Sequence, residues 1–304
     1  MNPARLRAYL MLLAVSAIWG VASPVIKFTL QAFDPDIFLT YRYFISTLLA
    51  IVIFIFAGLK LPRNLNTIIV LIVYAFLNSV VGLGLLFFGM DNTTVLDMTL
   101  ITLLMPLIVS TAGVIFLNEK VTKREKIGIG IAIIGTLLTV VEPLFINNGA
   151  SLKISGNLLI LGYVASTTIT AVLAKRLLRQ NVEPITLVNS SFIIGFISFF
   201  AFIWYSKSLF GIWDQILTTA PIYHAGVWFM AVISGTLAFW LSNKAQKTIE
   251  IGEQSLFSYL YPIFSLPLAV LWLGETFTTI HIIGGVVIAI GVAIAEIKKK
   301  RYIN

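Results

Sequence analysis

The residues best suited to chemistry in this 304-residue sequence are two carboxylates and two prolines that recur 156 positions apart. Asp97 and Glu253 each stand near the start of an apolar stretch, and Pro106 and Pro262 stand near the middle of the same stretches. Because a charge within an apolar span is costly and commonly functional, the two acidic residues are candidate proton carriers. A proline lacks the N–H and displaces the carbonyl four residues earlier, so both prolines are candidate hinges.

Hydroxyl, amide and aromatic side chains accompany the prolines and form candidate substrate-binding stripes. At about 100° per residue, Thr99, Thr102 and Pro106 share one helix face, and Ser255, Ser258 and Pro262 repeat it. Further candidates on other apolar stretches are Ser16, Trp19, Ser23, Asn78, Tyr163, Thr167, Trp240, Asn243 and Tyr259. Such a site suits a small zwitterionic or amphipathic molecule better than a bare metal ion. The alternative is that the small residues merely allow close helix packing and the prolines merely kink the helices.

Several charged residues have simpler explanations than chemistry. Arg42 and Lys27 lie toward the outer ends of their stretches, so we expect both to snorkel to the membrane surface, with substrate contact as the less favoured alternative. Asp97 lies about 140° around its helix from Thr102, off the proposed stripe, so proton coupling is the less favoured interpretation. We expect Glu119 and Glu275 to bind backbone amides or basic loop residues and to fix the turn into the next helix.

Enzymatic alternatives lack the necessary residues. The sequence contains no cysteine and two histidines, His224 and His281, neither of them in a metal-binding array. No glycine-rich phosphate loop appears, so we expect no metal, no cofactor and no direct use of ATP. An intramembrane lipid-modifying enzyme stays open, with Asp97 and Arg42 as its reacting pair, and so does a passive channel or scaffold.

The elements that position these side chains are apolar helices. With 59% apolar residues, 11% charged residues and a mean hydropathy of +0.97, the chain lies outside the range of soluble domains. A membrane-spanning helix needs about 20 apolar residues. We predict spans at Tyr9–Leu30, Ile37–Ala57, Thr67–Met90, Thr94–Leu117, Lys126–Leu144, Gly156–Leu177, Ile185–Tyr205, Tyr223–Ala245, Gly252–Leu273 and Thr279–Ala295. The predicted fold is an all-α polytopic membrane protein of ten transmembrane helices.

The positions of the basic residues behind the net charge of +8 indicate a membrane topology rather than a nucleic-acid partner. Of the 21 basic residues, 17 fall in loops on one side of the predicted spans and three on the other. The positive-inside rule therefore places both termini in the cytoplasm, and the bilayer, as an inner membrane, is the expected partner. The sequence fixes no oligomeric state, and a monomer is compatible with it.

An internal repeat divides the chain into residues 1–148 and 149–304, two halves of one membrane domain. A shift of 156 aligns Pro106 with Pro262, Glu119 with Glu275, Gly128 with Gly284 and Gly135 with Gly291, and a shift of 149 aligns Lys27 with Arg176 and Asp34 with Glu183. Because each half has five spans, the halves are predicted to be inverted relative to one another. Inverted repeats are typical of alternating-access transporters, although duplication without transport is the alternative.

The motifs around the prolines resemble a known family. They read YLYPIFSLPLAVLWLGETFTTIHIIGGVVIAIG from Tyr259 to Gly291 and LMPLIVSTAGVIFLNEKVTKREKIGIGIAIIG from Leu104 to Gly135. This pattern resembles the EamA-type permeases of the drug/metabolite transporter superfamily, with Asn118 in place of the glycine found at Gly274. The resemblance implies a ten-helix exporter of amino acids or related metabolites, with a cavity lined mainly by spans one, three, four, six, eight and nine. A nucleotide-sugar-type carrier is a further alternative with the same span count.

Overall fold

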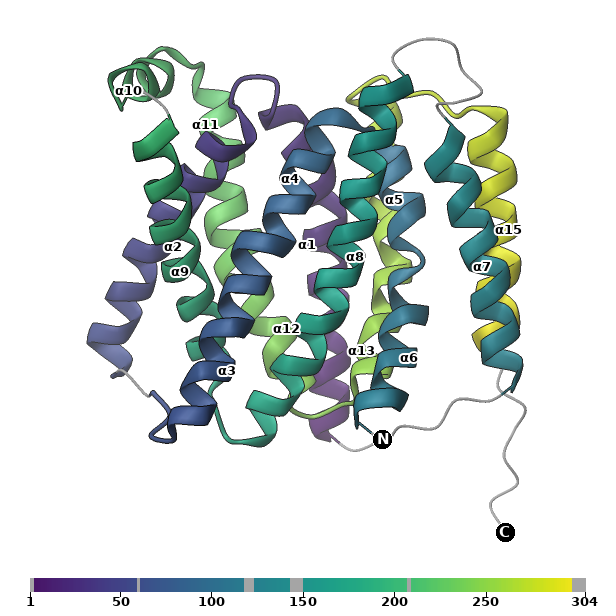
Figure 1. Cartoon of the computed structure of the whole chain (residues 1–304), viewed down its shortest axis with the longest axis horizontal. Coiled ribbons are helices and arrows are strands. Elements are labelled where there is room, and N and C mark those ends of the chain that lie inside the picture. The colour runs from purple at the N-terminus through teal and green to yellow at the C-terminus, as the bar shows by residue number, and fades with distance from the viewer. Residues whose placement is uncertain (1–2, 59–60, 118–122, 143–149, 207–208, 297–304) are drawn as a thin grey trace.

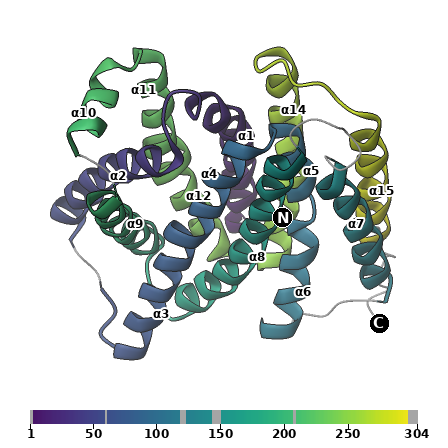
Figure 2. The same ribbon diagram turned by 45° about the horizontal axis from the view of Figure 1, so that its top comes forward.

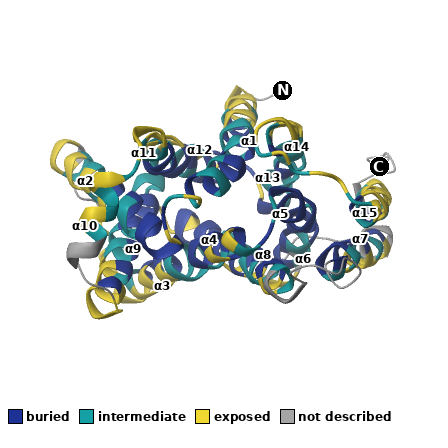
Figure 3. Ribbon diagram, turned by 90° about the horizontal axis from the view of Figure 1, so that it is seen from above, coloured by how far each residue is buried: buried dark blue, intermediate teal, exposed yellow. Residues whose placement is uncertain are grey.

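A computed structural model describes residues 3–58, 61–117, 123–142, 150–206 and 209–296. All regular secondary structure in these ranges is helical, which confirms the all-α prediction. The long helices lie side by side (Figure 1), and their buried faces turn toward the middle of the bundle (Figure 3).

Helices overlap each of the ten predicted spans. By length and composition, eight helical stretches are long and apolar enough to cross a membrane, and two shorter apolar helices cover Ile127–Val141 and Thr279–Ile294. The uninterrupted helices are α1 (Pro3–Thr29), α2 (Pro35–Ala57), α7 (Lys123–Val141), α8 (Ala150–Arg179), α9 (Pro184–Ser206) and α15 (Thr279–Glu296). A short helix, α10 (Leu209–Thr218), lies between α9 and α11.

Four stretches are interrupted. Two contain π-helical segments: α3 (Leu65–Phe76), η1 (Leu77–Gly82) and α4 (Leu83–Asn92) form one, and α11 (Pro221–Trp228), η3 (Phe229–Leu237) and α12 (Ala238–Gln246) form the other. Two leave the α-helical form just before a proline: α5 (Val95–Thr102) is separated by a turn from α6 (Met105–Leu117), and α13 (Ile251–Ser255) passes through the 3₁₀ segment η4 (Leu256–Leu260) into α14 (Tyr261–Leu271). The irregular segments therefore occur in matching places in the two sequence halves, and π-bulges are frequent at functional sites.

Helices α7 and α15 pack against each other through glycines at one side of the molecule (Figure 2). A Cβ added to Gly135 would lie 2.8 Å from the carbonyl oxygen of Gly284, and one added to Gly291 would lie 2.7 Å from that of Gly128. No larger side chain fits without moving a backbone, as expected where small residues let membrane helices approach closely.

The turn after α14 positions a carboxylate at the start of α5. Gly274 has a φ of +68°, a conformation that glycine adopts without steric cost, and Glu275 follows it. Glu275 accepts hydrogen bonds from the N–H groups of Val95 and Leu96 at 2.8 and 2.9 Å. This confirms the expected binding of backbone amides by Glu275, while Glu119 lies outside the described residues.

The outer surface of the bundle is apolar. Large hydrophobic side chains such as Phe56 and Leu271 are more than four-fifths exposed, whereas polar residues such as Ser16, Asp97 and Asn157 are fully buried. This distribution suits a lipid bilayer rather than water, because apolar side chains that face lipid carry no free-energy cost of hydration. Together with the apolar helices, it supports an integral membrane protein.

Candidate functional site

Two adjoining cavities lie in the middle of the bundle. The first, of about 120 Å³, is named here the Gln254 lobe and is lined by Ser16, Tyr74, Ser242, Gln246, Gln254 and Ser258 among others. The second, of about 100 Å³, is named the Arg42 lobe and is lined by Ser23, Arg42, Gly82, Met98, Tyr163 and Ser234 among others. Seven residues line both: Trp19, Asn78, Met105, Thr167, Thr170, Phe239 and Tyr261. The two lobes therefore form one two-part site.

Aromatic side chains stand where the lobes adjoin. The ring of Trp19 packs edge-on against Phe239 at 5.1 Å and against Tyr261 at 6.2 Å between ring centroids. The indole Nε1–H of Trp19 donates to the carbonyl oxygen of Ser234 at 3.1 Å, which fixes the orientation of its ring. Since Ser234 lies in the π-helical segment η3, the irregular backbone there contributes directly to the cavity wall.

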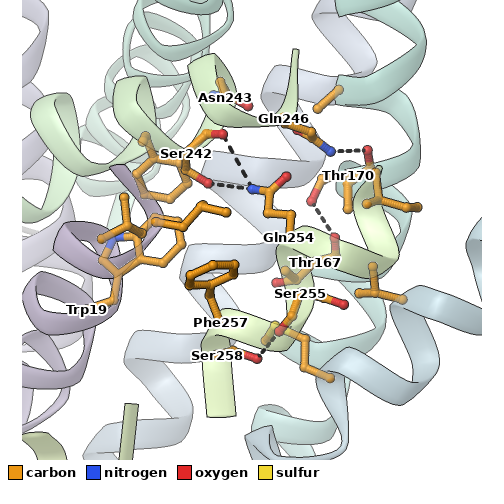
Figure 4. Close-up of a pocket in the computed structure, with 18 of the residues that line it drawn as sticks. Trp19, Thr167, Thr170, Ser242, Asn243, Gln246, Gln254, Ser255, Phe257 and Ser258 are labelled. Carbon is orange, nitrogen blue, oxygen red and sulfur yellow. Dashed lines mark hydrogen bonds between the residues drawn. The ribbon is translucent and has the colours of Figure 1, made fainter. Parts of the chain in front are cut away.

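Amide and hydroxyl side chains make the polar wall of the Gln254 lobe (Figure 4). The Nε2 group of Gln254 donates to Ser242 Oγ at 2.8 Å, and that of Gln246 donates to the Ala171 carbonyl oxygen at 3.0 Å. Because these bonds leave hydroxyl and amide atoms on the cavity wall, the lobe offers donors and acceptors without a formal charge. Such a surface can hydrogen-bond a polar small molecule while its apolar neighbours contact the rest of it.

Most of the predicted site residues line one of the lobes. Those that do are Ser16, Trp19, Ser23, Asn78, Tyr163, Thr167, Asn243, Ser255 and Ser258. Four lie elsewhere: Thr99 bonds to Ser265 at 3.1 Å, Thr102 bonds back to the Thr99 carbonyl, Trp240 packs under the Lys244 ammonium, and Tyr259 lines neither lobe. For all thirteen residues, those that line a lobe included, a role in substrate binding stays a prediction.

The 3₁₀ segment explains which face of the ninth predicted span meets the cavity. Residues three apart are eclipsed in a 3₁₀ helix, whereas they are offset by about 60° in an α-helix. Across η4, Ser255, Ser258 and Tyr261 therefore align and all three line the Gln254 lobe. Pro262 follows inside α14 and lines neither lobe, so a hinge role for it is separate from substrate contact.

The corresponding wall in the first half is apolar. Met98 and Met105 of the fourth predicted span line the cavities, and a shift of 156 residues aligns them with Gln254 and Tyr261. Pro106 does not line either lobe, although its carbonyl oxygen accepts a 3.4 Å hydrogen bond from Ser255 Oγ. The two halves thus contribute the same positions but different chemistry: flexible thioethers from one, an amide and a phenol from the other.

Asp97 lies in a buried ion network outside the lobes. Its Oδ1 is 2.8 Å from His281 Nε2 and its Oδ2 is 3.0 Å from Lys153 Nζ. The Lys153 ammonium is also 2.8 Å from a carboxylate oxygen of Glu142, and the Thr94 hydroxyl donates to Asp97 at 2.7 Å. Since Asp97 and Glu142 are fully buried, this network ties α5 to the end of α7, to α8 and to α15.

The same network contains three groups typical of metal ligands. Oxygen and nitrogen atoms of Asp97, Glu142 and His281 all lie within 4.8 Å of one another. However, the Thr278 N–H donates to His281 Nδ1 at 3.2 Å, so His281 Nε2 carries a proton that it donates to Asp97. The Lys153 ammonium contacts both carboxylates and already supplies a positive partner to each, although it neutralises one of their two negative charges.

Glu253, the second candidate proton carrier, also forms an ion pair. The Arg5 guanidinium contacts both of its carboxylate oxygens, at 2.6 and 2.8 Å, and the Tyr9 hydroxyl donates to it. The side chain of Glu253 is 26% exposed and that of Arg5 is 50% exposed. Neither Asp97 nor Glu253 lines a lobe, so proton coupling through them stays a prediction.

Several residues that line the lobes were not predicted as site residues, Arg42 above all. Its side chain is 1% exposed and lines the Arg42 lobe, so the expectation that it snorkels to the surface is wrong. Lys27 donates to the carbonyl oxygens of Met90 and Asp91, which makes it a cap for the end of α4. Gln254, Phe239 and Tyr261 also line the lobes and were not predicted. For Gln254 and Tyr261, the available signal was their spacing on either side of Ser258.

Comparisons with known proteins agree with this architecture. The sequence pattern of the EamA-like transporter family matches twice, over residues 6–141 and 154–296. An uncharacterised transporter of Bacillus subtilis (strain 168), YyaM, is 28% identical over 96% of this chain and 94% of its own length. A probable amino-acid metabolite efflux pump of Salmonella typhimurium (strain LT2) is 25% identical over 93% and 92% of the two chains.

A solved crystal structure supports the fold itself. It shares 16% sequence identity with this chain, covers 97% of both chains and superposes with a TM-score of 0.63. At that identity the likeness speaks for the helical arrangement alone. With the family pattern matched over most of the chain and a polar cavity within apolar helices, the protein is a membrane transporter, not an enzyme, and belongs to the EamA-like transporter family.

Proposed function

We propose that this transporter exports a small amphipathic metabolite, an amino acid or a related compound, by alternating access across the inner membrane. The observation that carries the proposal is the two-lobed cavity, to which both halves of the chain contribute polar side chains. An aromatic cluster of Trp19, Phe239 and Tyr261 stands between the lobes. A compound held there would be reached from one side of the membrane through the Gln254 lobe and from the other side through the Arg42 lobe.

The proposal includes ten spans in two inverted halves, residues 1–148 and 149–304. The glycine contacts of α7 and α15 support it, because Gly135 meets Gly284 while Gly291 meets Gly128. Along α7 the partner residues on α15 run backward, so these two helices are antiparallel. Under the 156-residue shift the two contacts exchange with one another, which is the relation expected across a pseudo-two-fold axis in the membrane plane. The double match of the family pattern also supports two halves.

The proposed orientation has both termini in the cytoplasm. Basic residues gather at the end of the bundle where α1 begins and where α8 and α12 end: Arg5 contacts Glu253, and Lys175 donates to the carbonyl oxygens of Gln246 and Ile249. A concentration of Lys and Arg at one end supports a cytoplasmic location for that end. The Gln254 lobe, which includes residues near this end, would then face the cytoplasm.

The substrate is best sought by metabolite analysis of cells that overproduce the chain, scored for compounds that accumulate outside. Because the Salmonella relative is described as a probable amino-acid metabolite efflux pump, amino acids and their metabolites are the first compounds to examine. Purified protein reconstituted in vesicles should then transport the compound with saturable kinetics that are stimulated by counter-substrate. Flux that rises in proportion to concentration without saturation would contradict a carrier.

Alternating access itself can be tested by single-cysteine labelling, since the chain contains no cysteine. Ser255→Cys reports on the Gln254 lobe and Ser23→Cys on the Arg42 lobe. Adding the exported compound should protect one position while exposing the other, whereas the exposed Ser206→Cys control should label equally throughout. Simultaneous labelling of both lobes from both sides would point to a channel instead.

Proton coupling and facilitation without coupling are the two alternatives for the energy source, to be tested second. An imposed pH gradient should accelerate flux, and Asp97→Asn or Glu253→Gln should remove that acceleration if either carboxylate carries the proton. Indifference of the wild type to the gradient would leave a facilitator, with both carboxylates acting only as ion-pair partners.

A further inference from the structure

Arg42 is a buried cation with no partner among the described residues. Its Nε, Nη1 and Nη2 atoms are inaccessible to solvent and none has a hydrogen-bond partner in the described part of the chain. Its guanidinium lies 5.4 Å from the ring centroid of Tyr43 and 5.2 Å from that of Phe87. Cation–π contacts offset only part of the cost of removing a charge from water, so the site is incomplete as it stands.

The fold does not require a cation at this position. The 149-residue shift aligns Arg42 in the second predicted span with Ser191 in the seventh. Ser191 is equally buried, and its hydroxyl simply donates to the Leu187 carbonyl oxygen at 2.9 Å. Because the same place in the other half is filled by a small neutral side chain, the unpaired charge of Arg42 calls for a separate explanation.

The cavity around Arg42 offers no compensating charge. Among the described residues that line the two lobes, Arg42 is the sole charged side chain, and no carboxylate is present. Gly235 packs beside the guanidinium, since a Cβ there would lie 3.4 Å from Arg42 Nη2. A planar guanidinium with free N–H groups in such a place is suited to bind a carboxylate through two parallel hydrogen bonds.

We propose that Arg42 binds the anionic head group of the transported compound, and that this compound is a small monocarboxylate, amino acids included. Its carboxylate lies in the Arg42 lobe, and its body lies against Trp19, Met105 and Tyr261, which line both lobes. The assignment rests on the proposed carrier function and narrows its substrate class. It also accounts for the burial of Arg42, because a ligand carboxylate would offset the free-energy cost of removing the guanidinium from water.

Binding can be measured on the full purified chain in detergent micelles, by the rise in thermal unfolding midpoint followed through tryptophan fluorescence. The probes are monocarboxylates from acetate to phenylpropionate, the free amino acids, and the primary amide of each. At least one carboxylate should stabilise the wild-type chain more than its amide does, with an affinity difference of roughly tenfold to hundredfold. If every amide binds as well as its carboxylate, or if no carboxylate binds, the inference is wrong.

Two substitutions examine Arg42 directly. Arg42→Gln should lose the preference for the carboxylate while its ligand-free unfolding midpoint is unchanged or higher, since an unpaired buried charge is removed. Arg42→Lys keeps the positive charge but not the two parallel N–H donors of the guanidinium, so it should retain part of the affinity for the carboxylate. Arg179→Gln, which removes an exposed cation paired with Glu250, is the matched control and should bind as the wild type does. Equal carboxylate binding by Arg42→Gln and wild type overturns the assignment.

The outcome separates this inference from the carrier function. Saturable transport of neutral or cationic compounds alone, unaffected by Arg42→Gln, removes the carboxylate assignment and leaves the carrier. Arg42-dependent binding of a carboxylate without any flux in vesicles removes the carrier and leaves the binding site. If Arg42→Gln does not fold, the wild-type comparison of each carboxylate with its amide and the Arg42→Lys variant decide the question.

Discussion

Asp97 and Glu253 occupy the same position in the two halves of the chain, yet their surroundings differ. Asp97 is fully buried and contacts Lys153 and His281, whereas Glu253 is about one-quarter exposed and contacts Arg5. Each carboxylate lies in the first turns of its span and ties that span to another helix. At this duplicated position, both halves therefore keep an ion pair that joins two helices, but the two ion pairs differ in burial and hence in strength.

The energetic consequence follows from the cost of an unpaired charge. Breaking a buried ion pair leaves a desolvated charge behind, whereas the partners of an exposed pair regain water. The end of the bundle held by Asp97 should accordingly resist opening more than the end held by Glu253. In an alternating-access cycle this difference would favour the conformation in which the Asp97 end stays closed.

The largest expected effect comes from removing the cation of the buried network. Lys153→Met leaves Asp97 and Glu142 buried without the ammonium that contacts both, at 3.0 and 2.8 Å. We expect a loss of about 3–5 kcal/mol in the free energy of unfolding. Unfolding in mixed micelles of increasing SDS content, followed by tryptophan fluorescence, measures it.

A double substitution provides the control for that measurement. Adding Asp97→Asn to Lys153→Met removes one of the stranded charges and should restore part of the lost stability. If Lys153→Met alone costs no more than Glu253→Gln, the contrast between a strong and a weak end is wrong.

Much of this architecture was predictable from the sequence because a membrane makes apolar length a direct signal. Helices lie at every predicted span, and the repeat located the two proline-containing stretches that border the cavity. Most of the proposed polar site residues also line a lobe, since polar groups in a bilayer are tolerated where they face a cavity or another helix.

The rest depended on helix phase and on tertiary contacts. The stripe that assumed a regular α-helix included Pro262, but the 3₁₀ turn of η4 brings Tyr261 to the cavity instead. Asp97 and His281 are 184 positions apart, so nothing in the local sequence indicated their 2.8 Å contact. Arg42 was interpreted from its distance to the end of the span, which carries no information on the helices that bury it.

A second, smaller effect concerns the cap that holds α5 beside the buried network. Glu275→Ala removes the acceptor of the Val95 and Leu96 N–H groups and should destabilise the chain by about 1 kcal/mol. Glu275→Gln, which keeps an acceptor oxygen, should cost less. The same SDS titration measures both, and an equal cost for the two variants would show that the backbone bonds are not the stabilising element.

The smallest expected effect is that of the exposed pair. Glu253→Gln removes the charge that contacts Arg5, and both side chains are partly solvated, so the thermal unfolding midpoint should fall only slightly. Because salt screens exposed charges, the difference from wild type should shrink as sodium chloride is raised from low concentration to about 1 M. The Lys153→Met deficit, which arises from buried groups, should persist over the same range. A Glu253→Gln deficit that is large and independent of salt would mean that this pair is shielded from water in the membrane, and that the two ends of the bundle are held with comparable strength.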